Sequence, residues 1–180
     1  MHFVALSSAH AQTTVFFERV KTGTPQDVQK AISNGADINA RNEYYGETPL
    51  IYAAQYNSNP AVITTLLKAG ADIEARTTAE GFPASLGWTA LLWAAGYNRP
   101  EVITVLLKAG ADINVRGKAG TTVLMAAARY NSQPEVMTTL LKAGADAKAK
   151  DNIGQTAFDW AQGNATLKGT DAYRMLQQAS

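Results

Sequence analysis

The sequence predicts an all-α protein, a solenoid of about five helix-pair units stacked along one axis. Three observations predict it: the tripeptide Gly-Ala-Asp recurs, a Gly-x-Thr marker recurs between its copies, and a proline stands ten residues before each Gly-Ala-Asp glycine. Those glycines are Gly35, Gly70, Gly110 and Gly144. A fixed order of markers at such a period is typical of repeat architectures, in which each unit buries its apolar side against its neighbours.

The first helix of each unit is predicted to begin after the threonine of the Gly-x-Thr marker. A threonine hydroxyl can accept a hydrogen bond from a backbone N–H that the first helical turn leaves unpaired. Pro49, after Thr48, fits the first helical position, where a missing N–H costs nothing. The threonines are Thr48, Thr89, Thr122 and Thr156. They predict first helices over residues 49–58, 90–98 and 123–132.

The second helix of each unit is predicted to begin at the proline and to end before Gly-Ala-Asp. Val62, Ile63, Leu66 and Leu67 form one apolar stripe at helical spacing, and the following units repeat it. Glycine after such a stripe favours a left-handed helix end. The second helices are therefore expected over residues 60–69, 100–109 and 134–143.

A known repeat family shares these features. The segment Gly46-Glu47-Thr48-Pro49-Leu50, followed by Ala53-Ala54, Val62-Ile63, Leu66-Leu67 and Gly70-Ala71-Asp72-Ile73, closely resembles the ankyrin repeat. The resemblance extends from Val15 to the C-terminus. It implies antiparallel helix pairs joined by projecting hairpin loops, with partners bound on the concave face that loop tips and first helices form. The family's histidine after Pro-Leu is absent, and Ile51, Leu92, Met125 and Asp159 stand there instead.

The repeat register divides the chain into a leader, residues 1–11, and an ankyrin repeat domain, residues 12–180. The domain comprises a cap (12–41), three full repeats (42–76, 77–116 and 117–150) and a C-terminal cap (151–180). Aligning Pro25 with Pro60 sets Asp27 against Val62, so the first unit is more polar on one side. Arg174, Gln177 and Gln178 provide the polar face of the last unit. Polar ends argue against open-ended self-stacking, so a monomer is expected.

The leader matches nothing in the repeats. Ala9-His10-Ala11 before Gln12 has the small-x-small pattern of a secretory cleavage site, although no Lys or Arg precedes it. Two interpretations stay open, a signal-peptide remnant, which we favour, and a disordered leader. The first predicts a mature protein that starts at Gln12 and is periplasmic or secreted; the alternative is cytoplasmic. No stretch approaches 18 apolar residues, so membrane insertion is not expected.

The composition argues against several other functions. The formal net charge is +1, without the basic excess that nucleic acids attract, so no nucleic-acid partner is expected. Cysteine is absent and the only histidines are His2 and His10, both in the leader. The repeats therefore lack the commonest nucleophile, general base and metal ligand, and no catalytic residue, cofactor or metal is expected. The recurring aspartates of Gly-Ala-Asp are interpreted as turn residues that accept backbone hydrogen bonds.

A protein-binding, non-catalytic scaffold is thus the leading hypothesis. The alternative from a different class is an enzyme, or an enzyme-accessory subunit, that uses carboxylate or lysine chemistry. The scaffold and enzyme hypotheses differ in whether the acidic and basic side chains have a function besides helix capping and turn formation.

Aromatic residues that the repeat does not require are the candidate binding residues, because Tyr and Trp are enriched at interfaces. Tyr44, Tyr45 and Trp88 lie beside the turn glycines, and Tyr52 and Trp93 follow the family's histidine position. The connection over residues 77–86 is about six residues longer than its counterparts and adds Phe82 and Leu86. Tyr44, Tyr45, Phe82 and Trp88 are expected to form one contact surface. The recurring Tyr-Asn pairs at Tyr56, Tyr97 and Tyr130 are interpreted as loop packing instead.

Overall fold

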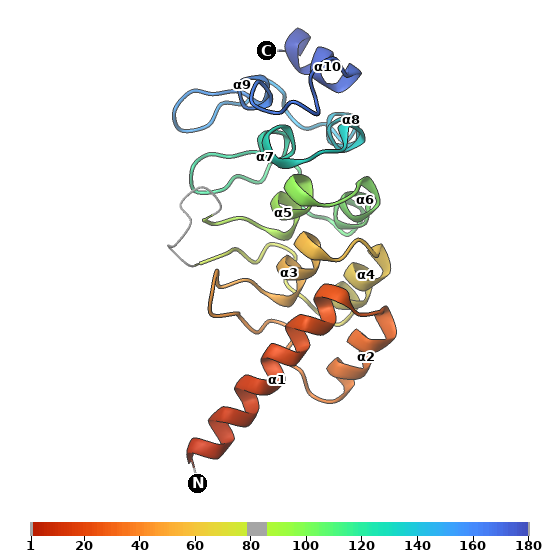
Figure 1. Ribbon diagram of the computed structural model, residues 1–180, viewed down its shortest axis with the longest axis vertical. Coiled ribbons are helices and arrows are strands. Elements are labelled where there is room, and N and C mark those ends of the chain that lie inside the picture. Colours follow the sequence, from red (N-terminus) through yellow and green to blue (C-terminus); the bar gives the residue numbers. More distant parts are fainter. Residues whose placement is uncertain (1, 79–85, 180) are drawn as a thin grey trace.

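The computed structural model describes residues 2–78 and 86–179, and all regular elements in this part of the chain are helices. They pair in chain order as α1 (His2–Thr22) with α2 (Pro25–Ser33), α3 (Pro49–Tyr56) with α4 (Pro60–Lys68), α5 (Ala90–Tyr97) with α6 (Pro100–Lys108), α7 (Val123–Tyr130) with α8 (Pro134–Lys142), and α9 (Ala157–Ala161) with α10 (Asp171–Ala179). Figure 1 shows the first helices as a column between the projecting loops and the column of second helices. The predicted solenoid of five helix pairs is confirmed.

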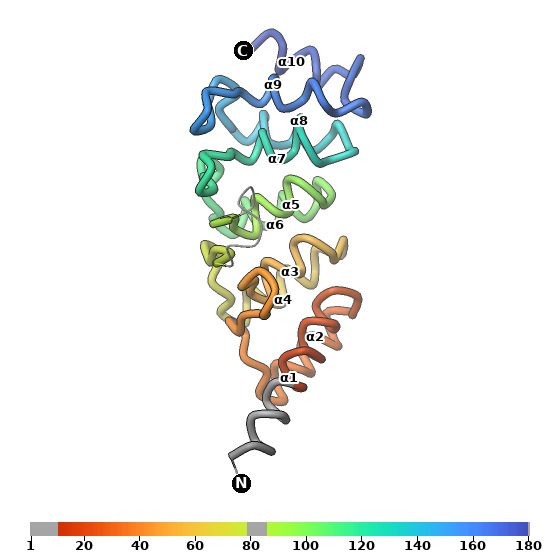
Figure 2. The backbone as a smooth tube through the Cα atoms, turned by 60° about the vertical axis from the view of Figure 1, so that its left-hand side comes forward, coloured from red at the N-terminus to blue at the C-terminus, as the bar shows by residue number. Residues whose placement is uncertain are grey.

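The units follow one another along the long axis, in the order of the sequence (Figure 2). Small side chains at the middle of the first helices allow this stacking, since Ala53, Ala94 and Ala127 are fully buried between neighbours. The second helices contribute the larger apolar groups of the same core. In α4 these are Val62, Ile63 and Leu66, all without solvent exposure. The core is therefore one continuous layer between the two helix columns.

Threonine caps start most of the first helices, as predicted. The hydroxyl oxygens of Thr48, Thr122 and Thr156 accept hydrogen bonds from the backbone N–H three residues later. Thr89 departs from the prediction. Its backbone has the same extended conformation, but its side chain makes no capping bond. The structure offers no reason for this difference.

The first helices end at Tyr56, Tyr97 and Tyr130, earlier than the residues 58, 98 and 132 that the sequence predicted. The asparagine after each tyrosine explains the early end. Asn98 is buried, and its amide nitrogen donates to the carbonyls of Ala54, at 2.8 Å, and Asn57, at 3.1 Å, in the preceding unit. Its side-chain oxygen accepts from Arg99 N–H at 2.8 Å. We call this series, Asn57, Asn98, Asn131 and Asn164, the asparagine ladder.

The second helices end as the Gly-Ala-Asp marker predicts. Gly70 has a φ of 92°, a left-handed conformation that glycine adopts without steric cost. The N–H of Ala71 returns to the carbonyl of Leu66 at 3.1 Å. The carboxylate of Asp72 then accepts from the N–H of Glu74 at 3.0 Å. The same Asp bond recurs at Asp37, Asp112 and Asp146, so the interpretation of these aspartates as turn residues is confirmed.

A second ladder joins the loops. The guanidinium of Arg76 donates to the carbonyl of Gly87, at 2.9 Å, in its own hairpin loop, and to that of Arg116, at 2.7 Å, in the next. Arg41 and Arg116 bridge their neighbouring loops in the same way. Each arginine thus donates to a part-buried carbonyl in its own loop and to an exposed carbonyl in the next, and these bonds connect the projecting loops.

The described ends of the longer connection over residues 77–86 are held by backbone hydrogen bonds. Thr77 N–H donates to the carbonyl of Trp88, and Gly87 N–H donates back to Thr77. Leu86 is half-buried, and its carbonyl accepts from the N–H of Lys118 in the next loop. Phe82, predicted to belong to the contact surface, lies outside the described residues.

The first and last units of the stack differ in structure. At the C-terminal end α10 buries Ala172 and Leu176 and exposes Arg174, Gln177 and Gln178, as the cap prediction requires. At the other end α1 begins at His2, so the expected boundary between residues 11 and 12 falls inside a helix. Among the helices described, none combines the length and apolarity of a membrane span.

Candidate functional site

The first helices carry a stripe of aromatic side chains on their side away from the second helices. The fourth and eighth positions after the capping threonine are one helical turn apart and share a face. They hold Tyr52 and Tyr56 in α3, and Trp93 and Tyr97 in α5. The later units add Tyr130 and Trp160, the first unit adds Phe17, and Trp88 joins from a loop. We call these eight residues the aromatic band: Phe17, Tyr52, Tyr56, Trp88, Trp93, Tyr97, Tyr130 and Trp160.

Rings contact one another within units and across three boundaries between units: the first and second, the third and fourth, and the fourth and fifth. Tyr52 packs edge-to-face on Phe17, with ring centroids 5.3 Å apart, and on Tyr56 at 4.7 Å. Tyr97 stacks on Tyr130 of the next unit at 5.5 Å, with an angle of 20° between the ring planes. Offset and edge contacts at these distances are the favoured arrangements of aromatic pairs. The band is therefore rigidly supported.

Cations lie over the tyrosines towards both ends of the band. Lys21 Nζ is 5.1 Å from the centroid of Tyr56, and the Arg129 guanidinium lies 5.7 Å from Tyr130 and 5.3 Å from Trp160. All three separations are within the range of cation–π attraction. The band thus presents ring faces and edges together with positive charge.

Exposure separates the band into two layers. Tyr56 and Tyr97 are 45% and 48% exposed, whereas Trp88 and Trp93 are 1% and 5% exposed. Trp88 and Trp93, which the sequence offered as candidate binding residues, are therefore almost completely covered by their neighbours. Trp88 packs against Trp93, with centroids 5.0 Å apart, and against Tyr130 at 6.0 Å. The two tryptophans form a buried base beneath the tyrosines.

Of the two glycines that lie against the Trp88 ring, one makes room for it. A Cβ atom added to Gly117 would come within 2.8 Å of the Trp88 ring, closer than real Cβ contacts allow. A Cβ on Gly96 would lie 3.7 Å from the same ring, in ordinary contact. The absence of a side chain at Gly117, on the following loop, is what allows the indole to turn inward.

Buried acidity accompanies the tyrosines. Glu47 has no exposed surface, and burial raises the pKa of its carboxyl, although a hydrogen bond from the Asn42 amide at 2.6 Å opposes this. Burial also raises the pKa of Tyr56 to about 12, with the Glu47 charge as the next cause. The Tyr56 hydroxyl therefore stays protonated near physiological pH, so it can donate a hydrogen bond.

The structure brings two of the predicted binding residues, Tyr44 and Tyr52, to one hollow. This hollow, of about 270 Å³, opens between α1 and the loop of the second unit. Tyr44 is 83% exposed at its edge and Tyr52 is half-buried. Tyr45 is half-buried nearby, and its N–H donates to the side chain of Asn42. Leu86 lies on the next loop and does not line this hollow.

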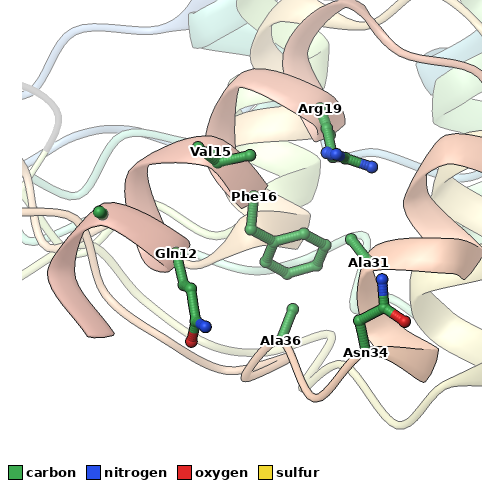
Figure 3. Close-up of a pocket in the computed structure, with 8 residues that line it drawn as sticks. Gln12, Val15, Phe16, Arg19, Ala31, Asn34 and Ala36 are labelled. Carbon is green, nitrogen blue, oxygen red and sulfur yellow. The ribbon is translucent and has the colours of Figure 1, made fainter. Parts of the chain in front are cut away.

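A second hollow, of about 320 Å³, lies on an adjoining face of α1, at the outer end of the first unit. Figure 3 shows Phe16 at its centre, with Val15 and Arg19 on α1 and Ala31 and Asn34 across from them. Its lining contains no carboxylate. Carboxylates line only one of the two hollows on α1.

Sequence reasoning missed Tyr56 and Tyr97 as exposed residues, because it interpreted the recurring tyrosines Tyr56, Tyr97 and Tyr130 as loop packing. Tyr130 is half-buried and does pack against the core. The asparagine of each pair makes the buried hydrogen bonds to the preceding unit. The spacing of four residues from Tyr52 to Tyr56, and from Trp93 to Tyr97, was the available signal. It places each pair on one helix face.

The ionisable groups with shifted pKa have structural explanations. Hydrogen bonds from the backbone N–H and hydroxyl of Thr24 lower the pKa of Asp27, and those of Thr156 lower that of Asp159, in both cases at a helix start. Within the described residues no group of three or more His, Asp or Glu side chains could hold a metal ion.

Comparison with known proteins gives two family matches and several relatives. Residues 16–117 match a model described as ankyrin repeats (3 copies), and residues 106–161 match one described as ankyrin repeats (many copies). Human ankyrin repeat domain-containing protein 40 is 39% identical over 69 residues, which are 38% of this chain and 18% of that protein. Human SH3 and multiple ankyrin repeat domains protein 1 is 38% identical over 92 residues, 50% of this chain and 4% of that protein. A putative ankyrin repeat protein of fowlpox virus is 50% identical over 46 residues, covering 26% of this chain and 9% of that protein. The chain thus matches only a small part of each of these relatives.

Proposed function

The chain belongs to the ankyrin repeat family, and from this premise we propose that it is a non-catalytic scaffold that binds a protein partner along its first helices and loops. Ankyrin repeats are in general protein–protein interaction modules. Their stacked units present a long continuous surface, and side chains from neighbouring units can contact one partner together.

The exposed tyrosines of the aromatic band are the observation that carries the proposal. Tyr56 and Tyr97 keep nearly half of their surface in water, although Tyr97 packs on the buried Trp93 and Tyr56 on the half-buried Tyr52. A rigid ring with a hydroxyl at its edge can bury a large apolar area and donate a hydrogen bond at little entropic cost. Side chains of this kind dominate the binding energy of many interfaces.

The proposal is tested on the partner that co-purifies with the native protein and is identified by mass spectrometry. Replacing Tyr97 with Ser is expected to weaken binding of that partner by about 2 kcal/mol, roughly 30-fold, if the ring is buried in the interface. The melting temperature should change little, because the ring is half exposed.

Lys68→Ala and Lys108→Ala are the matched controls, because both lysines are exposed at the ends of second helices on the other side of the stack. Affinity should be unchanged in both. If the lysine variants lose affinity while Tyr97→Ser keeps it, the partner occupies the second-helix side and the proposal is wrong.

We further propose that the chain is cleaved after Ala11 and that the mature protein works outside the cytoplasm, in the periplasm or as a secreted protein. The small-x-small pattern Ala9-His10-Ala11 supports this. N-terminal sequencing of the native protein should give Gln12 as the first residue. Retention of His2 in a cytoplasmic fraction would contradict it.

A further inference from the structure

We propose that the hollow between α1 and the second unit's loop receives a cationic side chain, a lysine or arginine of the partner protein. The inference rests on the proposed function, because it specifies which chemistry of the partner this part of the surface recognises. We call this hollow the acidic pocket; its lining includes Phe17, Glu18, Glu43, Tyr44 and Tyr52.

The size of the acidic pocket suits one side chain. Its volume of about 270 Å³ is a little below the range of roughly 300–1,000 Å³ that is usual for small-molecule sites. It is open to the surface beside Tyr44, whose ring is 83% exposed. A long, flexible side chain from a partner lying along the first helices could therefore enter it from the side of the loops.

Aromatic rings form part of its wall. Phe17 and Tyr52 meet edge-to-face, with centroids 5.3 Å apart, and Tyr44 stands at the edge. The faces of such rings attract cations, most strongly where water is partly excluded. The methylene groups of a lysine or arginine would also bury apolar surface against the same rings.

The charge of the acidic pocket favours a cation. Glu18, on α1, and Glu43, on the loop, both line it. Glu47 lies directly behind, since the Asn42 amide in the lining donates to its carboxylate at 2.6 Å. Burial first, and then the charges of Glu18 and Glu47, raise the pKa of Tyr52.

Arg41 is the single cationic residue in the lining, and its charge offsets one of the two carboxylates there, which leaves the lining with a net negative charge. Nη1 donates to the carbonyls of Gly46 and Arg76, so the group belongs to the loop ladder. Among the described residues no ion pair involves Glu18. A cation that enters the pocket would therefore meet a carboxylate without having to displace an existing partner.

Two larger hollows of the described surface have a different character. The hollow on the adjoining face of α1 has Arg19 as its charged residue and no carboxylate. The groove between α4 and α6 is lined by Lys68 and Lys108, also without a carboxylate. A small hollow of about 60 Å³ beside α7 includes Asp146, but Arg116 lines it too and it has no aromatic ring. The overall charge, which is +1, does not by itself account for two carboxylates at the acidic pocket.

The test uses the full chain and two blocked tripeptides, acetyl-Gly-Arg-Gly-amide and the same peptide with norleucine in place of arginine. Titration is followed by amide chemical shifts in NMR up to about 10 mM peptide, because one side chain supports only weak affinity. The arginine peptide should give saturable shifts confined to α1 and the second unit's loop. The norleucine peptide should bind at least about 10-fold more weakly, and added salt should weaken the arginine peptide.

Variants assign the effect to the proposed residues. Glu18→Gln is expected to reduce the affinity for the arginine peptide about 5-fold, the effect of losing one partly exposed charge pair, and Tyr44→Ala about 3-fold. Glu101→Gln, an exposed carboxylate on α6, is the control and should change nothing. Equal binding of the two peptides, shifts spread over the surface, no saturable shift, or equal effects of Glu18→Gln and Glu101→Gln would each overturn the proposal.

The native partner separates this inference from the proposed function. If Tyr97→Ser loses the partner while Glu18→Gln and Tyr44→Ala bind it with unchanged affinity, the acidic pocket is refuted and the scaffold function stands. If Tyr97→Ser also binds the partner with unchanged affinity, the result contradicts the proposed function itself, on which the pocket proposal rests.

Discussion

Truncation of Asn98 to alanine should weaken the stacking of neighbouring units more than the loss of a single apolar contact would. The side chain is 3% exposed and lies between the second and third units. Its amide donates to the carbonyls of Ala54 and Asn57, and its oxygen accepts from Arg99 N–H. Alanine removes all three hydrogen bonds and leaves two carbonyls and one N–H without their partner.

The expected magnitude follows from these three bonds. Each intramolecular hydrogen bond contributes about 1 kcal/mol net, and a buried group left unpaired costs about 1–3 kcal/mol. Partial access of water to Arg99 N–H, which is only partly buried, reduces the sum. We expect a loss of about 3–4 kcal/mol in the free energy of unfolding, which corresponds to roughly 6–16 °C in melting temperature for a chain of this size.

Thermal and urea unfolding, followed by circular dichroism, measure this loss, and hydrogen exchange locates it. Asn114→Ala, at an exposed position in a loop, is the matched control and should stay within about 0.5 kcal/mol of the wild type. Because repeat units are coupled mainly to their neighbours, exchange should accelerate first at the boundary between α3 and α5. A melting temperature of Asn98→Ala within about 2 °C of the wild type would refute the reasoning.

Three further predictions test the aromatic base and the buried acid. Trp88→Ala should destabilise folding by about 3–5 kcal/mol in chemical unfolding, because the ring fills the space between units; a loss below about 1 kcal/mol would show that the ring is not packed. Gly117→Ala should lower the melting temperature, because its Cβ would approach the Trp88 ring to 2.8 Å, and combining it with Trp88→Ala should relieve most of that cost. For Glu47, burial raises the pKa of the carboxyl in the folded state above its ordinary value of 4.5. The protonated carboxyl is therefore tolerated in the folded protein below pH 4.5, and the folded protein loses stability as pH rises through the raised pKa and the carboxyl ionises. The melting temperature of Glu47→Gln should therefore exceed that of the wild type at about pH 7, and the two melting temperatures should become equal at about pH 4. If the variant were instead most stabilised at acidic pH, the pKa of Glu47 would not be raised in the folded protein.

The sequence was sufficient for the fold because its markers act locally. A glycine such as Gly70, a proline such as Pro60 and a threonine such as Thr48 each end or begin a helix through bonds within a few residues. Local rules of this kind can be read from a single chain. The errors in helix ends were small, and they occurred where Asn98 and its equivalents leave the helix to bond to another unit.

The candidate site was harder to predict, because burial depends on residues of other units. Trp88 follows a turn glycine, a position that favours exposure, yet its ring is buried because Gly117, 29 residues later, leaves space for it. The acidic pocket likewise joins Glu18 of the first unit to Tyr44 of the second. Neither of these contacts between units can be predicted from the pattern of one repeat. The repeat predicts that the units stack, but it does not predict which side chains of two units lie against each other.

The layering of the aromatic band gives its two halves different consequences for mutation. Trp88 and Trp93 contribute buried area, so their loss should appear as lost stability, whereas Tyr56 and Tyr97 have surface still to bury, so their loss should appear as lost affinity. The layers are mechanically connected, since Trp93 contacts Tyr97 with ring centroids 5.6 Å apart. A tyrosine that rests on a fixed indole loses less conformational freedom when a partner covers it than one on a mobile loop would. Burial of the tryptophans therefore strengthens the case for binding at the tyrosines, although it excludes the tryptophans themselves from direct contact.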